Sequence, residues 1–86
     1  MATNDDLQRW IVDILRDAGS EMSVLEVSRA VWERHEAELR ESGDLFFTWQ
    51  YNLRWAAQKL RNQGVLKLQD GRRNGGWALA QLDRSD

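Results

Sequence analysis

The sequence predicts a small α+β domain that is mostly helical, with three helices followed by a C-terminal β-hairpin. Three observations support this prediction. Apolar residues recur at helical spacing in three segments, glycine follows two of those segments, and two short runs of alternating hydrophobicity flank a glycine-rich stretch near the C-terminus. A chain of 86 residues forms a single domain around one small core.

The first helix is expected over residues 5–18. Its apolar residues recur at the spacing of one helical face: Leu7, Trp10, Ile11, Ile14, Leu15 and Ala18. Thr3 or Asn4 is expected to cap its start, and Gly19 to end it.

The second helix follows a short extended connection over residues 20–22. Ser23 and Glu26 have the spacing of a capping box, in which each side chain bonds the other residue's N–H group. The buried stripe consists of Val24, Val27, Ala30 and Val31. Further along, Glu36 and Arg40 are expected to form an exposed ion pair one turn apart.

The third helix is expected over residues 49–63. Residues 42–44 end the second helix, and the apolar run 45–47 is expected to pin the connection into the core. Thr48 is the expected N-cap of the third helix, and Gly64 ends it.

The hairpin is expected from residues 65–69 and 77–80, which alternate between apolar and polar side chains. The inward-facing residues would be Leu66, Leu68, Trp77 and Leu79. Between the two runs, residues 70–76 contain three glycines and two arginines, so they predict a flexible basic tip.

Composition excludes several classes of protein. The chain has no cysteine, a single histidine (His35) and no phosphate-binding glycine loop, so we expect no enzyme activity, no metal site and no cofactor. Neither a signal peptide nor a stretch of about 20 apolar residues is present, so a cytoplasmic location is expected. The expected organisation is a flexible N-terminus over 1–4, the domain over 5–80 and a flexible tail over 81–86.

The formal net charge of −2 conceals an uneven distribution. Residues 1–49 carry eleven acidic residues and five arginines, a net charge of −6, whereas residues 50–76 carry six basic residues and one aspartate, a net charge of +5. Because salt screens charges more than about 8–10 Å apart, a polyanion responds to the local field and not to the total charge. The basic stretch is therefore the candidate binding surface. The alternative is that its charges only solvate an exposed face.

A helix-turn-helix followed by a β-hairpin is the winged helix-turn-helix arrangement. Its third helix is narrow enough to enter a major groove of DNA, and the hairpin, called the wing, reaches phosphates or the minor groove. We therefore expect a module that presents its third helix and the wing over residues 70–76 to double-stranded DNA.

One sequence pattern within residues 51–79 supports this expectation. It comprises Asn52, the triplet Arg54-Trp55-Ala56, Leu60, Gly64, and the pair Gly76-Trp77 before the last strand. The pattern resembles the N-terminal winged-helix domain of Mrr-type restriction endonucleases. The resemblance implies a DNA-binding role, accessory to an effector in a bacterial restriction or regulatory system. No pair of acids followed by Glu-x-Lys occurs in the chain, so cleavage is not carried over.

Two orientations of the third helix are compatible with the sequence. In the first, the core-facing residues are Trp49, Leu53, Ala56 and Leu60, and the outward residues are Tyr51, Arg54, Trp55, Gln58, Arg61 and Asn62. In the second, the core-facing residues are Asn52, Trp55, Ala56 and Leu60, and the outward residues are Gln50, Arg54, Ala57, Gln58 and Arg61. We favour the second, because a tryptophan close to the core more often packs than stands in water.

The candidate DNA-binding residues have side chains that suit DNA. Arginine donates two hydrogen bonds to guanine O6 and N7 or forms a fork with a phosphate, and glutamine bonds adenine N6 and N7. The candidates are Gln50, Arg54, Gln58 and Arg61 on the third helix, and Arg72 and Arg73 at the tip of the wing. For the arginines, the alternative is a purely solubilising role.

The alternative function is a winged-helix protein–protein interaction module that does not bind DNA. The second helix is acidic and offers a surface for a basic partner through Glu33, Glu36, Glu38 and Glu41. Trp32 lies off the buried stripe of that helix, so we expect it to be exposed and to mark a contact with a protein partner or a homodimer contact. The other tryptophans are expected in the core: Trp10, Trp49, Trp55 and Trp77. His35 is expected to be partly buried, without a catalytic or ligand role.

Overall fold

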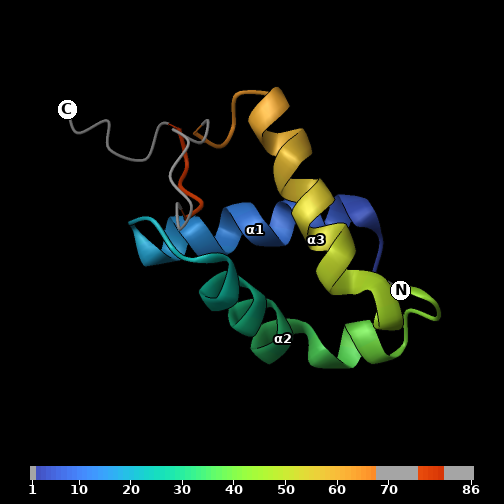
Figure 1. The fold of residues 1–86 in the computed structure, drawn as a ribbon. Coiled ribbons are helices and arrows are strands. Elements are labelled where there is room, and N and C mark those ends of the chain that lie inside the picture. The colour runs from blue at the N-terminus through green and yellow to red at the C-terminus, as the bar shows by residue number, and fades with distance from the viewer. Residues whose placement is uncertain (1, 68–75, 81–86) are drawn as a thin grey trace.

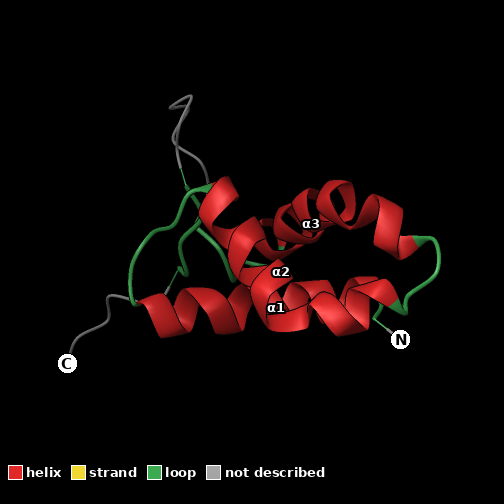
Figure 2. Ribbon diagram, turned by 90° about the horizontal axis from the view of Figure 1, so that it is seen from below, coloured by secondary structure: helices red, strands yellow, loops and turns green. Residues whose placement is uncertain are grey.

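Three helices make up most of the chain, whose structure, a computed structural model, describes residues 2–67 and 76–80. They are α1 (Asn4–Ala18), α2 (Val24–Arg40) and α3 (Leu45–Asn62). α3 crosses in front of α1 in Figure 1, and the view from below in Figure 2 shows α3 above α1. The described residues thus form a three-helix globule. Within them, no helix is both long and apolar enough to cross a membrane.

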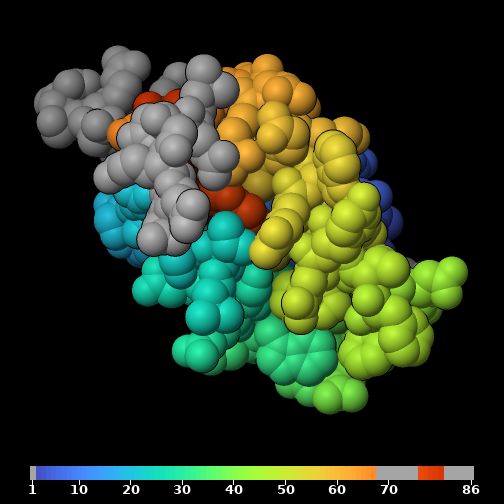
Figure 3. Space-filling model, viewed as in Figure 1, coloured from blue at the N-terminus to red at the C-terminus, as the bar shows by residue number. Residues whose placement is uncertain are grey.

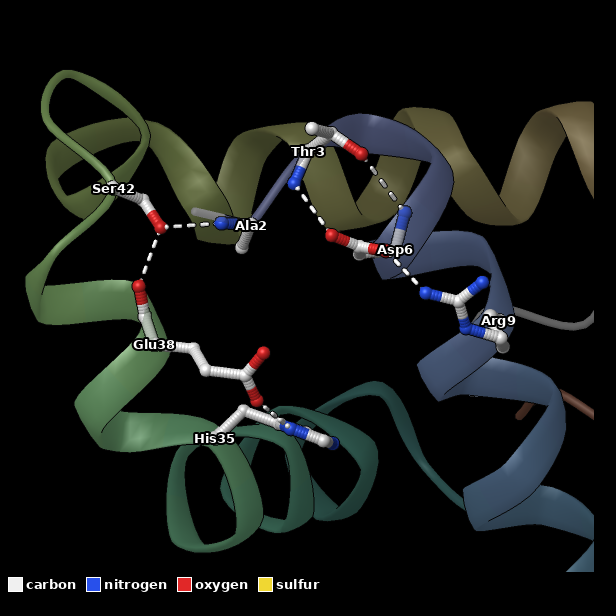
Figure 4. Close-up of polar contacts among 7 residues, drawn as sticks. All are labelled: Ala2, Thr3, Asp6, Arg9, His35, Glu38 and Ser42. Atoms are coloured by element: carbon white, nitrogen blue, oxygen red, sulfur yellow. Dashed lines mark hydrogen bonds and ion pairs between the residues drawn. The ribbon is translucent and has the colours of Figure 1, made fainter.

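The structure selects Thr3 from the two predicted N-caps of α1, so the helix begins at Asn4, one residue before the expected start, and it ends at Ala18 as predicted. Thr3 is the N-cap, and its hydroxyl accepts a hydrogen bond from the N–H of Asp6 at 3.3 Å. In return, the Asp6 carboxylate accepts one from the N–H of Thr3 at 3.0 Å (Figure 4). Gly19 closes the other end with a left-handed φ of 72° and donates its N–H to the Leu15 carbonyl at 3.0 Å.

Ala2, within the segment expected to be a flexible N-terminus, packs against the core. It is 6% exposed, and its N–H donates to the Ser42 hydroxyl at 2.9 Å (Figure 4). Ser42 is itself buried, and its hydroxyl donates to the Glu38 carbonyl. These two bonds connect the start of the chain to the end of α2.

The local features predicted for α2 are confirmed. The Ser23–Glu26 capping box is present, with hydrogen bonds of 2.9 and 3.0 Å. Arg40 donates from Nε to Glu36 Oε2 at 2.8 Å, which is the predicted pair one turn apart. Both features depend on residues three or four positions apart, so local sequence is enough to specify them.

His35 is partly buried, as predicted, and it lies at a bend in α2. Its ring stacks on the ring of Trp10, with centroids 3.8 Å apart and planes 6° apart. Its Nδ1 lies 2.9 Å from Glu38 Oε1 (Figure 4). The backbone of His35 is non-helical, with φ −130° and ψ 23°, so the two halves of α2 follow different directions.

The expected start of α3 is wrong. The helix begins at Leu45, four residues earlier than predicted, and the expected core residue Phe47 is 82% exposed. Thr48 is not the N-cap, since its hydroxyl donates to the Asp44 carbonyl within the first turn at 3.4 Å. Leu45 and Phe46 continue the apolar side of the helix by one turn, so these residues extend the amphipathic pattern instead of ending it.

The favoured orientation of α3 is also wrong. The buried residues are Trp49, Leu53, Ala56, Ala57 and Leu60, whereas Trp55 is 58% exposed and Asn52 is half-buried. Residue 55 lies about 200° around the helix from residue 53, so Trp55 and Leu53 cannot face the same core. The first orientation buries one continuous stripe of large and small apolar side chains, and that stripe packs against α1.

Two segments near the C-terminus run antiparallel to each other. Lys67 donates its N–H to the Ala78 carbonyl, and Ala80 donates to the Val65 carbonyl, each at 2.9 Å. Leu66 and Leu79 form an isolated antiparallel bridge. The described residues contain bridges of this kind but no strand.

The second bridge joins Trp77 to Met22 in the connection between α1 and α2. The two residues exchange N–H to carbonyl hydrogen bonds of 3.0 and 2.8 Å. Leu66, Trp77 and Leu79 are buried, as predicted. The rest of the predicted hairpin, including Leu68, falls on residues 68–75, outside the described residues.

Candidate functional site

Four of the six candidate residues lie on one side of α3. Gln50, Arg54 and Gln58 are exposed, and Arg61 is partly buried. With about 100° of rotation per residue, the four positions fall within an arc of about 80° around the helix axis. The remaining candidates, Arg72 and Arg73, lie outside the described residues.

The basic residues of α3 have no carboxylate partners among the described residues. The helix carries Arg54, Lys59 and Arg61 and no acidic residue, and none of the three forms an ion pair within the part of the chain that the structure describes. In α1 and α2, by contrast, most arginines are paired: Arg9 with Asp6, Arg16 with Asp13, Arg34 with Asp17, and Arg40 with Glu36. Within residues 2–67 and 76–80, the positive charge of α3 is therefore not neutralised by ion pairs to carboxylates.

Arg61 combines a surface role with a packing role. Its Nη1 donates to Gln58 Oε1 at 3.2 Å, and Gln58 Nε2 donates to Asn62 Oδ1 at 3.1 Å. The Nε of Arg61 is buried and has no hydrogen-bond partner among the described residues. Burial lowers the pKa of the Arg61 guanidinium below its usual value, but an arginine stays charged at neutral pH. Arg54 is exposed and makes no such contacts with any described residue, so it is the more available cation.

A groove of about 790 Å³ separates α2 from α3. Its lining residues are Val24, Leu25, Ser28, Arg29, Trp32, Glu33, Phe46, Trp49, Gln50 and Arg54. In Figure 3, the teal surface of α2 meets the yellow-green surface of α3 on the face turned toward the viewer. Gln50 and Arg54 thus form part of a concave surface that also includes α2.

Arg29 is a cation of this groove that the sequence analysis did not single out. It is exposed on α2 and has no ion-pair partner among the residues that the structure describes. Glu33, one turn further along α2, lines the same groove and is the acidic residue there. Sequence spacing within α2 does not reveal these positions, because the groove forms only when α3 packs beside α2.

Trp32 is half-buried, whereas the sequence analysis expected it to be exposed. Its ring stacks on that of Trp49, with centroids 6.1 Å apart and planes 11° apart, and lies 6.3 Å from the ring of Phe46. The Arg40 guanidinium carbon lies 5.4 Å from the Trp32 ring centroid. The early start of α3 explains the difference, since it brings Phe46 and Trp49 over Trp32.

Three aromatic side chains form an exposed stripe on α3, which we call the aromatic stripe. Phe47, Tyr51 and Trp55 are spaced four residues apart and are 82%, 65% and 58% exposed. The rings of Tyr51 and Trp55 are arranged edge to face, with centroids 6.3 Å apart. The stripe lies beside the polar candidates, because Tyr51 is about 60° around the helix from Arg54. The sequence does not reveal the stripe while Phe47 is assigned to a connection and Trp55 to the core.

The remaining chemistry of the described residues is limited. No three His, Asp or Glu side chains within residues 2–67 and 76–80 lie close enough together to hold a metal ion. A scan against models of protein families, a search of curated proteins and a search of solved structures found no match to this chain. Its function therefore has to be inferred from the chemistry of its own surface.

Proposed function

We propose that this protein is a winged helix-turn-helix module that binds double-stranded DNA through α3. The observation that carries the proposal is the charge of α3: three basic residues, no acidic residue and no ion pair to a carboxylate among the described residues. A surface of this kind attracts a polyanion although the whole chain has a net charge of −2.

The C-terminal bridges support the winged form of the fold. Residues 65–67 and 76–80 run antiparallel, and Trp77 is bonded to Met22, so the two segments meet as the base of a hairpin would. In this proposal, the wing extends from that base through Arg72 and Arg73 to the DNA backbone or the minor groove. The resemblance of residues 51–79 to the N-terminal domain of Mrr-type restriction endonucleases agrees with this arrangement.

The proposed mechanism divides the residues of α3 by role. A major groove about 12 Å wide accepts an α-helix, so Gln50, Arg54 and Gln58 would face the base edges. Arg54 would donate two hydrogen bonds to a guanine, and the glutamines would bond adenines. Arg61, whose stem is packed, would contact a phosphate and set the position of the helix without reading sequence.

The resemblance further suggests that the module acts beside a restriction or regulatory effector. The present chain would provide DNA recognition, and a separate polypeptide would provide any catalysis. No cofactor takes part in this proposal.

The test is a fluorescence-anisotropy titration of a labelled random duplex over a range of salt concentrations. About five phosphate contacts predict a log–log slope of affinity against salt near −4 to −5. Replacing Arg54 with Gln is expected to weaken duplex binding by about 1–3 kcal/mol, roughly 5- to 150-fold.

The matched control is Arg16→Gln on α1, which removes the same charge from a residue already paired with Asp13 at 3.7 Å. This variant is expected to bind DNA within about twofold of the original chain, because exposed charges beyond a Debye length are screened. Absence of binding at low salt, or equal losses in the two variants, would contradict the proposal.

A second candidate function is protein recognition through the groove between α2 and α3. The observation that favours it is the apolar lining of the groove, in which Leu25 is 61% exposed beside Trp32 and Phe46. If this alternative holds, Leu25→Glu abolishes partner binding while Arg54→Gln leaves it intact. The DNA proposal predicts the opposite order of effects on duplex affinity.

A further inference from the structure

The aromatic stripe is not used by the contacts proposed with an intact duplex. The edges of paired bases in the major groove are mainly hydrogen-bonding groups, and the thymine methyl is the apolar feature among them. Three neighbouring aromatic rings that remain this exposed are unusual for a solvated helix face, and exposed apolar patches commonly mark binding sites. The aromatic stripe therefore fits a ligand that has flat apolar surfaces.

The charge of α3 narrows the choice of occupant. In a symmetric dimer formed through α3, the three cations of one copy would face the three cations of the other, and α3 has no acidic residue to offset them. A polyanion, by contrast, complements these cations, which form no ion pair in the part of the chain that the structure describes. The occupant that combines negative charge with flat apolar faces is a nucleic acid whose bases are accessible.

The geometry of the stripe suits stacking. Phe47 and Trp55 are eight residues apart, so the stripe extends about 12 Å along α3, which exceeds three stacked bases at about 3.4 Å each. Tyr51 and Trp55 meet edge to face and are 65% and 58% exposed, so most of each side chain is open to solvent. Arg54, on the same helix and about 60° from Tyr51, is placed to hold a phosphate of the same strand.

We propose that the aromatic stripe stacks on unpaired bases, so that the preferred substrate is DNA with a locally opened or extruded stretch. This inference rests on the proposed function and narrows its substrate class. Stacking between a base and an aromatic side chain tolerates any sequence, because every base has a π face. The aromatic stripe thus adds affinity for unpaired bases to the base contacts made by Gln50, Arg54 and Gln58.

The test compares two labelled DNAs of equal length at one salt concentration. One is a fully paired duplex of about 20 base pairs, and the other is the same duplex with about four central mismatched positions that form a bubble. The bubble is expected to bind roughly tenfold more tightly. Tyr51→Leu and Trp55→Leu are expected to reduce the ratio of the affinity for the bubble to the affinity for the paired duplex to about twofold or less. The reason is that leucine is apolar but has no π face.

The control variant is Arg54→Gln, which is expected to weaken binding to both DNAs by a similar factor. Tyr51 and Trp55 are exposed, so urea denaturation is expected to show the leucine variants as stable as the original chain. If the two DNAs bind equally, or if the ratio is unchanged in both leucine variants, this inference is wrong while duplex binding stands. If neither DNA binds, the proposed function fails together with it.

Discussion

At the scale of single residues, Gly76 determines how closely two distant segments approach. A Cβ atom at this position would lie 2.9 Å from Glu21 Cγ and closer still to the Met22 carbonyl oxygen, both shorter than van der Waals contact. The N–H of Gly76 donates to the Glu21 carboxylate at 2.6 Å, across 55 residues of sequence. Glycine is required at this position by a close backbone approach, so any side chain has to displace the neighbouring bridge between Met22 and Trp77.

We predict that Gly76→Ala lowers the free energy of unfolding by about 1–3 kcal/mol, because the added methyl group overpacks a backbone contact. Urea denaturation followed by tryptophan fluorescence measures this loss. The control is Gly64→Ala, whose Cβ would meet no atom of the described residues within 4 Å although its φ is 81°. That variant introduces only backbone strain, about 1–2 kcal/mol. A loss well below about 1 kcal/mol for Gly76→Ala would contradict the steric explanation.

Residue-scale features could be predicted where their partners are local. The capping boxes of Thr3 and Ser23 and the left-handed Gly19 follow from residues three or four positions away. The tight contact at Gly76 could not, because its partners are Glu21 and Met22 on a segment that only the folded chain brings near. In the sequence, Gly76 is one of three glycines in a turn-rich stretch and precedes Trp77 at the start of the last predicted strand, and neither feature indicates a contact with residues 21 and 22.

At the scale of elements, α3 has two competing apolar faces, and the folded core selects one of them. Trp49 is buried and stacks on Trp32, whereas Trp55 is exposed beside Tyr51. Ala56 and Ala57 are buried on the core-facing side of α3, and α3 packs against α1. Small buried side chains of this kind permit a close approach of two helices.

We therefore predict unequal losses for two chemically identical substitutions in α3. Trp49→Ala is expected to lower the free energy of unfolding by about 3–5 kcal/mol, since it leaves a cavity beside Trp32. Trp55→Ala is expected to cost less than about 1 kcal/mol, since the indole is largely in solvent. Chemical denaturation of the two variants measures both values. Similar losses in both would contradict an α3 orientation that buries Trp49 and exposes Trp55.

The error in orienting α3 from sequence has a physical origin. Both candidate faces place a tryptophan next to alanine and leucine at helical spacing, so periodicity alone does not separate them. Which face of α3 is buried depends on the turn that begins at Leu45, because that turn places Phe46 and Trp49 over Trp32. When residues 45–47 are assigned to a connection, the first turn of the helix is left out. The buried face of the helix is then inferred from too few positions.

At the scale of the whole molecule, charge is divided between helices. α1, with four aspartates and two arginines, lies behind α3 in Figure 1, whereas α3 has only positive charges. The sequence analysis predicted a basic stretch after residue 49, and the structure places four of its candidate residues on one side of α3. It did not predict the groove with Arg29 and Glu33, because a surface shared by two helices depends on their packing.

The uneven distribution of charge among the helices leads to a prediction. Two substitutions that change the net charge equally are expected to change DNA affinity by different amounts, because they alter the local electric field in different places. Glu33→Gln and Asp5→Asn each change the net charge from −2 to −1. Glu33 lines the groove with Arg54, whereas Asp5 lies in the first turn of α1. Because salt screens charges beyond about 8–10 Å, Glu33→Gln is expected to raise duplex affinity about two- to fivefold, and Asp5→Asn to leave it within about 1.5-fold.

Fluorescence anisotropy at low salt measures both affinities, and a second titration at about 0.3 M salt checks the electrostatic origin, because the gain from Glu33→Gln shrinks as screening increases. Equal gains from the two variants would mean that total charge governs the interaction and that no particular face is used. No gain from Glu33→Gln at low salt would mean that bound DNA stays away from the groove between α2 and α3. The groove would then be free for a protein partner, and Arg54 would act only from its outer side.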